Sequence, residues 1–108
     1  MKVIAITPYK KEDTLTIFIM DGLHDIGVDV IATDPGNNVK KTYKDDEVIE
    51  HSKDADYILA FAGKHEYNGV PAPKYYLLDE INRPEVTAYI DGSEYNWTSF
   101  PTKNYPRI

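Results

Sequence analysis

The sequence predicts an α/β fold, a three-layer α/β/α sandwich with a four-stranded parallel sheet, Rossmann-like or flavodoxin-like in form. Four short runs rich in Val, Ile, Tyr and Phe are the expected strands, at residues 2–7, 28–33, 57–62 and 86–91. Their apolar residues are nearly continuous, a pattern typical of strands that are covered on both faces. Segments with helical periodicity separate the runs. The resulting order, β-α-β-α-β-α-β, implies right-handed crossovers between parallel strands.

The first helical segment is "EDTLTIFIMDGLHDIG". Its apolar residues recur at helical spacing and are expected to form one buried stripe, Leu15, Phe18, Ile19, Leu23 and Ile26. Asp13 or Thr14 is the expected N-cap, and Gly27 is expected to end the helix in the left-handed conformation. We place Gly22 on the buried side, where it would allow close approach to the sheet.

The two later helical segments are shorter. "KDDEVIEHSKDA" has an acidic first turn, which suits the positive end of a helix dipole. Its expected inner face is Val48, Ile49 and Ala55. "APKYYLLDEINRP" brings Leu77, Leu78 and Ile81 together, and Pro84 is expected to stop that helix. Residues 1–97 are therefore predicted to form one Rossmann-like domain. Residues 98–108 are predicted to form an irregular tail that packs on the domain or on a partner.

Composition excludes several classes of protein. The formal net charge of −6 argues against nucleic acid as a partner, because phosphate binding needs a cationic surface. The absence of cysteine excludes a disulfide scaffold and a thiolate zinc site, and the scattered histidines lack the spacing of metal ligands. No metal and no cofactor is predicted. The apolar runs are too short for a signal peptide or a bilayer span, so we expect a cytoplasmic protein. It is expected to be a monomer or a homodimer.

In an open parallel sheet, ligands bind beyond the carboxyl ends of the strands. The first such exit carries Thr7, Tyr9 and Lys10 before a helix N-terminus, whose free amides attract anions. Neither the dinucleotide fingerprint nor the P-loop motif is present. Asp34 follows the second strand, where dinucleotide-binding domains hold a ribose-binding acid. Without the glycine loop, "DPGNN" is interpreted as a turn.

The third exit, "AGKHEYNG", contributes Gly63, Lys64 and His65. Gly63 would let the backbone approach a ligand closely, and His65 could carry a proton because its ordinary pKa lies near neutrality. The alternative interpretation is a solvent-exposed loop with no role in binding.

The fourth exit is "YIDGSEYNW", residues 89–97. Asp91 and Glu94 could act as a carboxylate pair, while Ser93 lacks the nucleophile elbow of a hydrolase. Tyr95 and Trp97 could stack on a sugar or a base. The alternative is a turn at residues 91–93 with Trp97 closing the core. We assign no catalytic residue. The candidate ligand-binding residues are Thr7, Tyr9, Lys10, Gly63, Lys64, His65, Asp91, Ser93 and Glu94.

Three phrases, "DTLTIFIMDGLHDIGVDVIATDPG", "ADYILAFAGK" and "EVTAYIDGSEYNW", together resemble the N-terminal half-domain of GT-B-fold glycosyltransferases, spore-coat-type and other family-1-like proteins. In that family the first strand is followed by a helix, a glycine and a second strand. Leu23, Gly27 and Val28 match these three features in this sequence. A later strand ends in an Asp-x-Ser-Glu-like phrase, as at residues 91–94. The resemblance covers residues 1–97. It implies an acceptor-side domain that is not catalytic alone and meets a sugar acceptor or sugar nucleotide through a second domain.

Two alternatives remain from the sequence. One is a stand-alone binding module of flavodoxin-like or receiver-like form that recognises a small anion or a protein. The stretch Thr7-Pro8-Tyr9 stands where a receiver would carry carboxylates, which counts against phosphotransfer. The other alternative is a structural or oligomeric protein whose tail, residues 95–108, exchanges between subunits.

Overall fold

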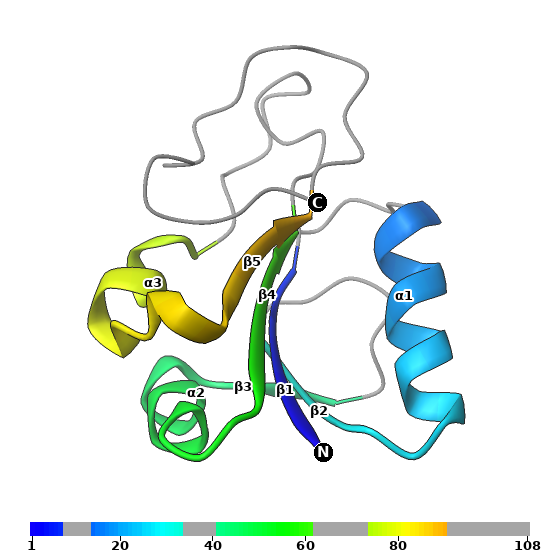
Figure 1. Ribbon diagram of the computed structural model, residues 1–108, viewed down its shortest axis with the longest axis horizontal. Helices are drawn as coiled ribbons and strands as arrows, with labels where there is room; N and C mark the ends of the chain where they lie inside the picture. The colour runs from blue at the N-terminus through cyan, green and yellow to red at the C-terminus, as the bar shows by residue number, and fades with distance from the viewer. Residues whose placement is uncertain (8–13, 34–40, 62–73, 91–108) are drawn as a thin grey trace, which may run out of the picture.

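The computed structural model describes residues 1–7, 14–33, 41–61 and 74–90. In these ranges the chain forms a five-stranded sheet in which neighbouring strands are parallel, in the order β3-β2-β1-β4-β5 (Figure 1). The strands are β1 (Lys2–Ile6), β2 (Asp29–Thr33), β3 (Thr42–Tyr43), β4 (Tyr57–Phe61) and β5 (Thr87–Ile90). The α/β class and the parallel sheet are confirmed.

The predicted strand count of four is wrong, because β3 was missed. β3 is only two residues long and pairs with the end of β2, Ala32 opposite Thr42 and Thr33 opposite Tyr43. So short an edge strand has no apolar run of its own, and lysines flank it at positions 41 and 44. Periodicity alone therefore gave no signal for it.

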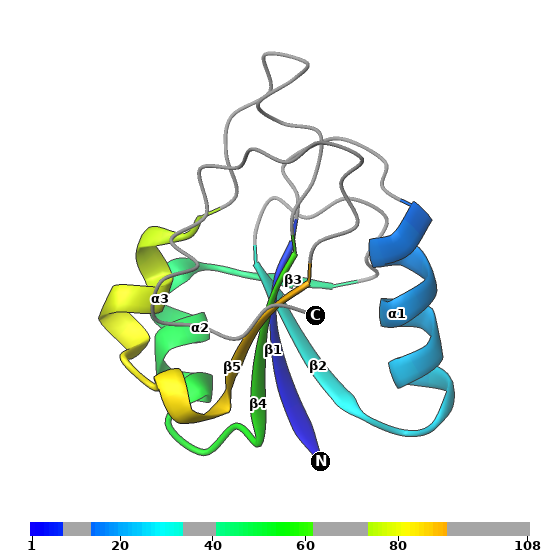
Figure 2. The ribbon, with the colours of Figure 1, turned by 45° about the horizontal axis from the view of Figure 1, so that its top comes forward.

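Helices cover both faces of the sheet. Helix α1 (Thr14–Asp25) lies on one face, and α2 (Asp45–Ser52) and α3 (Tyr76–Ile81) lie on the other (Figures 1 and 2). A short 3₁₀ helix, η1 (Pro84–Val86), leads into β5. The three-layer α/β/α arrangement is thus present. Among the described helices, none combines the length and the apolar composition that crossing a bilayer would require.

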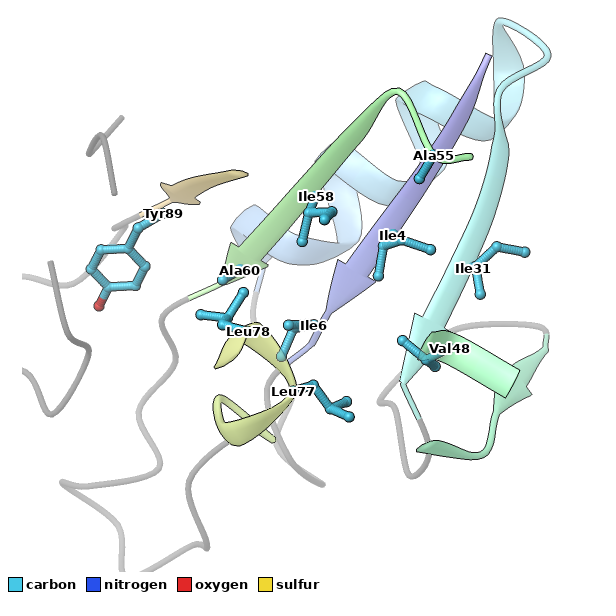
Figure 3. Packing of buried hydrophobic residues seen from close by; sticks show 10 residues of the cluster. All are labelled: Ile4, Ile6, Ile31, Val48, Ala55, Ile58, Ala60, Leu77, Leu78 and Tyr89. Carbon is cyan, nitrogen blue, oxygen red and sulfur yellow. The ribbon is translucent and has the colours of Figure 1, made fainter. Parts of the chain in front are cut away.

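The main core lies between the sheet and the α2–α3 layer. Figure 3 shows its buried residues, Ile4, Ile6, Ile31, Val48, Ala55, Ile58, Ala60, Leu77, Leu78 and Tyr89. A smaller cluster on the α1 side contains Ala5, Met20, Ala32, Phe61 and Ile90. Because burying one large aliphatic or aromatic side chain stabilises a fold by about 1.5–3 kcal/mol, the first cluster contributes most of the hydrophobic stabilisation.

The expected inner stripe of α1 is partly wrong. Phe18 is 70% exposed and Ile26 is 77% exposed, whereas Thr16 and Met20 are buried. Each residue turns an α-helix by about 100°, so Phe18 lies on the side opposite Thr16. Gly22 is also exposed, and a Cβ there would meet nothing within 4 Å, so it allows no close approach to the sheet. Asp13 and the side chain of Leu15 lie outside the described residues.

The expected helix ends are confirmed at one helix and corrected at another. Gly27 has a φ of +85° and ends α1 in a Schellman motif, in which Val28 N–H donates to Leu23 O at 3.0 Å. Helix α3 ends at Ile81, earlier than Pro84, because Asn82 adopts the left-handed conformation with a φ of 50°. Pro84 instead begins η1. The inner faces of α2 and α3 are as predicted, with Val48, Leu77 and Leu78 buried.

Candidate functional site at the carboxyl edge of the sheet

The direction of the chain across the sheet reverses between β1 and β4. From β1 the chain moves outward through β2 to β3, and then crosses β1 to reach β4 and β5. The four longer strands, β2-β1-β4-β5, follow the order with which flavodoxin-like sheets begin, and β3 extends it to the Rossmann order. Both fold types bind their ligands beyond the carboxyl ends of the strands that flank this reversal.

We define the carboxyl edge as the described residues at which the longer strands finish, Thr7, Thr33, Phe61 and Ile90. Thr7 directly follows Ile6, which pairs with Ala60, and Phe61 pairs with Ile90. The first, third and fourth predicted exits therefore leave from three adjacent strands at one end of the sheet. This confirms the geometric premise of the site prediction.

Of the candidate ligand-binding residues, Thr7 belongs to the described part of the chain. The others lie outside the described residues and remain predictions. They are Tyr9, Lys10, Gly63, Lys64, His65, Asp91, Ser93 and Glu94. Asp34 and the aromatic residues Tyr95 and Trp97 lie outside it too, as does the predicted boundary between the domain and the tail.

Thr7 and Thr33 form a buried pair of hydroxyl groups at this edge. The backbone N–H of Thr7 donates to Thr33 Oγ1 at 3.1 Å, and the two Oγ1 atoms lie 3.3 Å apart. Both residues are 2% exposed. The side chain of Thr33 thus accepts a hydrogen bond from the backbone just beyond the last residue of β1. Sequence reasoning selected Thr7 but missed its partner.

The end of β4 is held by a tyrosine from the start of the α3 region. Tyr75 donates its hydroxyl hydrogen to the carbonyl oxygen of Phe61 at 2.9 Å. Phe61 is fully buried in the smaller cluster, so this bond ties the backbone at the switch point to the α2–α3 layer. Sequence reasoning missed Tyr75, because "PKYY" offered only helical residues without a periodic polar pattern.

A second group, the Asp45 cluster, consists of Asp45, Lys74 and Tyr76. Asp45 begins α2, and Lys74 Nζ donates to its Oδ1 at 2.8 Å. The Tyr76 hydroxyl donates to Asp45 Oδ2. These bonds, the Lys74 bond first, hold the pKa of Asp45 below its ordinary value of 3.8. The bond to Asp45 and some desolvation raise the pKa of Tyr76 to about 12.

In the Asp45 cluster, Lys74 and Tyr76 both donate hydrogen bonds to Asp45. Its carboxylate is ionised and accepts from two donors, and Tyr76 stays protonated at neutral pH. These states suit neither a general base nor a general acid near neutrality. The cluster instead joins the starts of α2 and α3. The acidic first turn of α2 was the sequence signal for Asp45, but the residues that meet it are 29 and 31 positions away.

The described residues of the carboxyl edge offer hydroxyl groups and apolar side chains rather than charged side chains. Within the described ranges, no three His, Asp or Glu side chains gather as a metal site. Hydroxyl groups can hold the oxygens of a polar ligand without any change of charge. Comparison with protein-family models, curated proteins and solved structures yields no match for this chain.

Proposed function

We propose that this chain is a ligand-binding domain that corresponds to the acceptor-side half of a GT-B glycosyltransferase. It binds a sugar acceptor at the carboxyl edge and is not catalytic alone. The observation that carries the proposal is the strand order, which reverses between β1 and β4 in an all-parallel sheet. In sheets with this order, ligands bind at the carboxyl edge, and the candidate residues follow the strands that end there.

The sugar class of the ligand rests on the resemblance of residues 1–97 to those half-domains. In this proposal the sugar nucleotide is held chiefly by a second domain, so the chain itself binds without turnover. The buried hydroxyl pair, Thr7 and Thr33, is compatible with a neutral polar ligand.

A receiver-like function has less support. Receivers need carboxylates directly after the first strand, and Thr7 occupies that position, buried and bonded to Thr33. Binding of a small anion by a flavodoxin-like module remains the alternative that the test must separate from sugar binding. Both alternatives use the same edge, so the chemistry of the probe is what distinguishes them.

The test is a titration of the ¹⁵N-labelled chain, followed by amide chemical shifts. The probes are monosaccharides (glucose, galactose, N-acetylglucosamine and rhamnose), UDP-glucose and inorganic phosphate. We expect at least one monosaccharide to shift the amides of the carboxyl edge. The amides of the amino edge, where the strands begin at Lys2, Asp29, Tyr57 and Thr87, serve as the internal control and should not move.

The outcomes separate the alternatives. Shifts at the carboxyl edge with phosphate but with no monosaccharide would replace the proposal by the small-anion module. Shifts confined to the amino edge, or none with any probe, would contradict a ligand site at the carboxyl edge. Transfer of glucose from UDP-glucose by this chain alone would contradict the proposed division of labour between two domains.

A further inference from the structure

We infer that the Thr7–Thr33 pair is itself a ligand-binding element, which donates one hydroxyl hydrogen to an acceptor oxygen of the bound molecule. The inference rests on the proposed function for the location of the ligand, and it adds the chemistry that the ligand must present there. The shared chemistry is an oxygen with a free lone pair, as in a sugar hydroxyl or a phosphate.

The hydrogens of the pair can be counted. It has three donors, the backbone N–H of Thr7 and one O–H on each threonine. The N–H is taken by Thr33 Oγ1, and one O–H is taken by the contact between the two hydroxyl oxygens. Whichever oxygen donates in that contact, the other threonine keeps an O–H that the contact does not use. Among the described residues, neither hydroxyl has a further partner.

The burial of the pair implies that its remaining hydroxyl hydrogen needs an acceptor. Both residues are 2% exposed, and buried hydroxyl groups nearly always have a hydrogen-bond partner. Two other buried hydroxyls in the chain follow this rule. Thr87 Oγ1 donates to Arg83 O at 2.7 Å, and Ser52 Oγ donates to Ile49 O at 2.6 Å. Those two hydroxyls find their acceptors inside the fold. The Thr7–Thr33 pair has one O–H without a partner in the described part of the chain, and it stands at the edge where a ligand is expected.

The charge of the chain favours a neutral partner. A hydroxyl donor needs only an acceptor oxygen, and the net charge of −6 disfavours multiply charged anions at the surface. A sugar hydroxyl therefore fits the pair better than a phosphate. The two sources are separated by the probes.

The experiment compares matched threonine variants of the chain. The double variant Thr7→Val/Thr33→Val removes both hydroxyls at nearly constant volume, and Thr7→Ser/Thr33→Ser keeps them. Thr87→Val is the control, because it removes an equally buried hydroxyl that has a partner at the other edge. Dissociation constants are measured by amide shifts with the monosaccharide that moves the carboxyl edge most, and with inorganic phosphate.

We expect the Val double variant to bind the monosaccharide about three- to tenfold more weakly than wild type, the loss of one hydrogen bond. The Ser double variant and Thr87→Val should stay within about twofold. If phosphate binding falls and monosaccharide binding does not, the acceptor oxygen belongs to a phosphate. Binding of both probes by the folded Val double variant within twofold of wild type would overturn the inference while the proposed function stands. If no probe moves this edge in wild type, both fail together.

A ligand-free measurement covers the case in which the double variant does not fold. Thr7→Val alone leaves Thr33 Oγ1 to accept the backbone N–H of Thr7, and it gives up only the 3.3 Å contact between hydroxyls. Its melting temperature should therefore fall less than that of Thr87→Val, for which we expect a fall of about 4–8 °C. A fall for Thr7→Val as large as that of Thr87→Val would show that the pair is fully satisfied in the free chain, and would overturn the inference.

Discussion

The two edges of the sheet differ in how their polar groups find partners. Around the amino edge, Lys2 N–H donates to Asp56 Oδ2 at 2.8 Å and its Nζ donates to Asp54 at 2.7 Å. Arg83 donates from one nitrogen to two backbone carbonyls, those of Ser52 and Ala55, both at 2.7 Å. At the carboxyl edge, the Thr7–Thr33 pair has one O–H that finds no partner among the described residues. The polar groups described at the amino edge thus find their partners within the fold, and under our proposal the remaining hydroxyl hydrogen of the carboxyl edge meets a ligand.

The largest effect of a substitution is expected at Arg83, on the amino edge. Replacing Arg83 by Met keeps an unbranched, largely apolar side chain but removes the guanidinium that donates to the carbonyls of Ser52 and Ala55. We expect Arg83→Met to lower the free energy of unfolding by about 2–3 kcal/mol, because charge-assisted bonds to buried acceptors are costly to remove. Urea denaturation with an unchanged m-value would measure it. Ligand shifts at the carboxyl edge should be unaffected.

The matched variant is Arg83→Lys, which keeps the charge but cannot present the planar guanidinium. It should recover part of the loss. One weak hydrogen bond contributes about 0.5 kcal/mol to stability. If the free energy of unfolding of Arg83→Met differs from that of wild type by less than this, the amino edge does not depend on these contacts.

A smaller effect is expected at the Asp45 cluster. Asp45→Asn removes a charge that Lys74 faces and that favours the N-terminus of α2, so we expect a loss of about 0.5 kcal/mol for this partly exposed pair. The folded pKa of Asp45 lies below its unfolded value near 3.8. Its contribution is therefore present above pH 4 and is lost as the pH falls through the folded pKa. Denaturation midpoints of the two proteins at pH 7 and pH 2.5 measure this, and a difference that does not become smaller at pH 2.5 would contradict it.

The smallest effect concerns Tyr76 and is best seen by spectroscopy. Its pKa is raised to about 12, so its contribution to stability is present below the ordinary value of 10 and is lost as the pH rises towards 12. In an absorbance titration at 295 nm, Tyr76→Phe should remove a late-titrating phenol from a chain of nine tyrosines. Asp45→Asn should shift that phenol towards 10. Loss of an early-titrating phenol in Tyr76→Phe would show that the bond to Asp45 does not form.

Local patterns predicted much of the fold because they act over a few residues. Gly27 ends α1 as expected, since only a residue without a Cβ adopts its φ of +85° cheaply. The four apolar runs became β1, β2, β4 and β5 because continuous apolar segments must be covered on both faces. The same reasoning failed for Phe18, because a polar residue, Thr16, takes the inner face of α1. It also missed β3, which is too short to carry a pattern.

The location of the candidate site could be predicted from the sequence, but the contacts of its residues could not. Parallel strands bring their carboxyl ends to one edge, so Thr7 could be selected before its surroundings were known. Its partner Thr33 is 26 positions away in the chain. Nothing in the local sequence of either threonine marks the other.

The amino-acid sequence alone determined the class of the fold, the positions of the longer strands and the end at which a ligand is expected, because hydrophobic periodicity and turn chemistry are local. The tertiary structure alone decided the strand order, the outward face of α1 and the pairing of Thr7 with Thr33. These depend on which distant segments become neighbours when the chain crosses the sheet, and hydrogen bonds over such separations leave no trace in the spacing of residues.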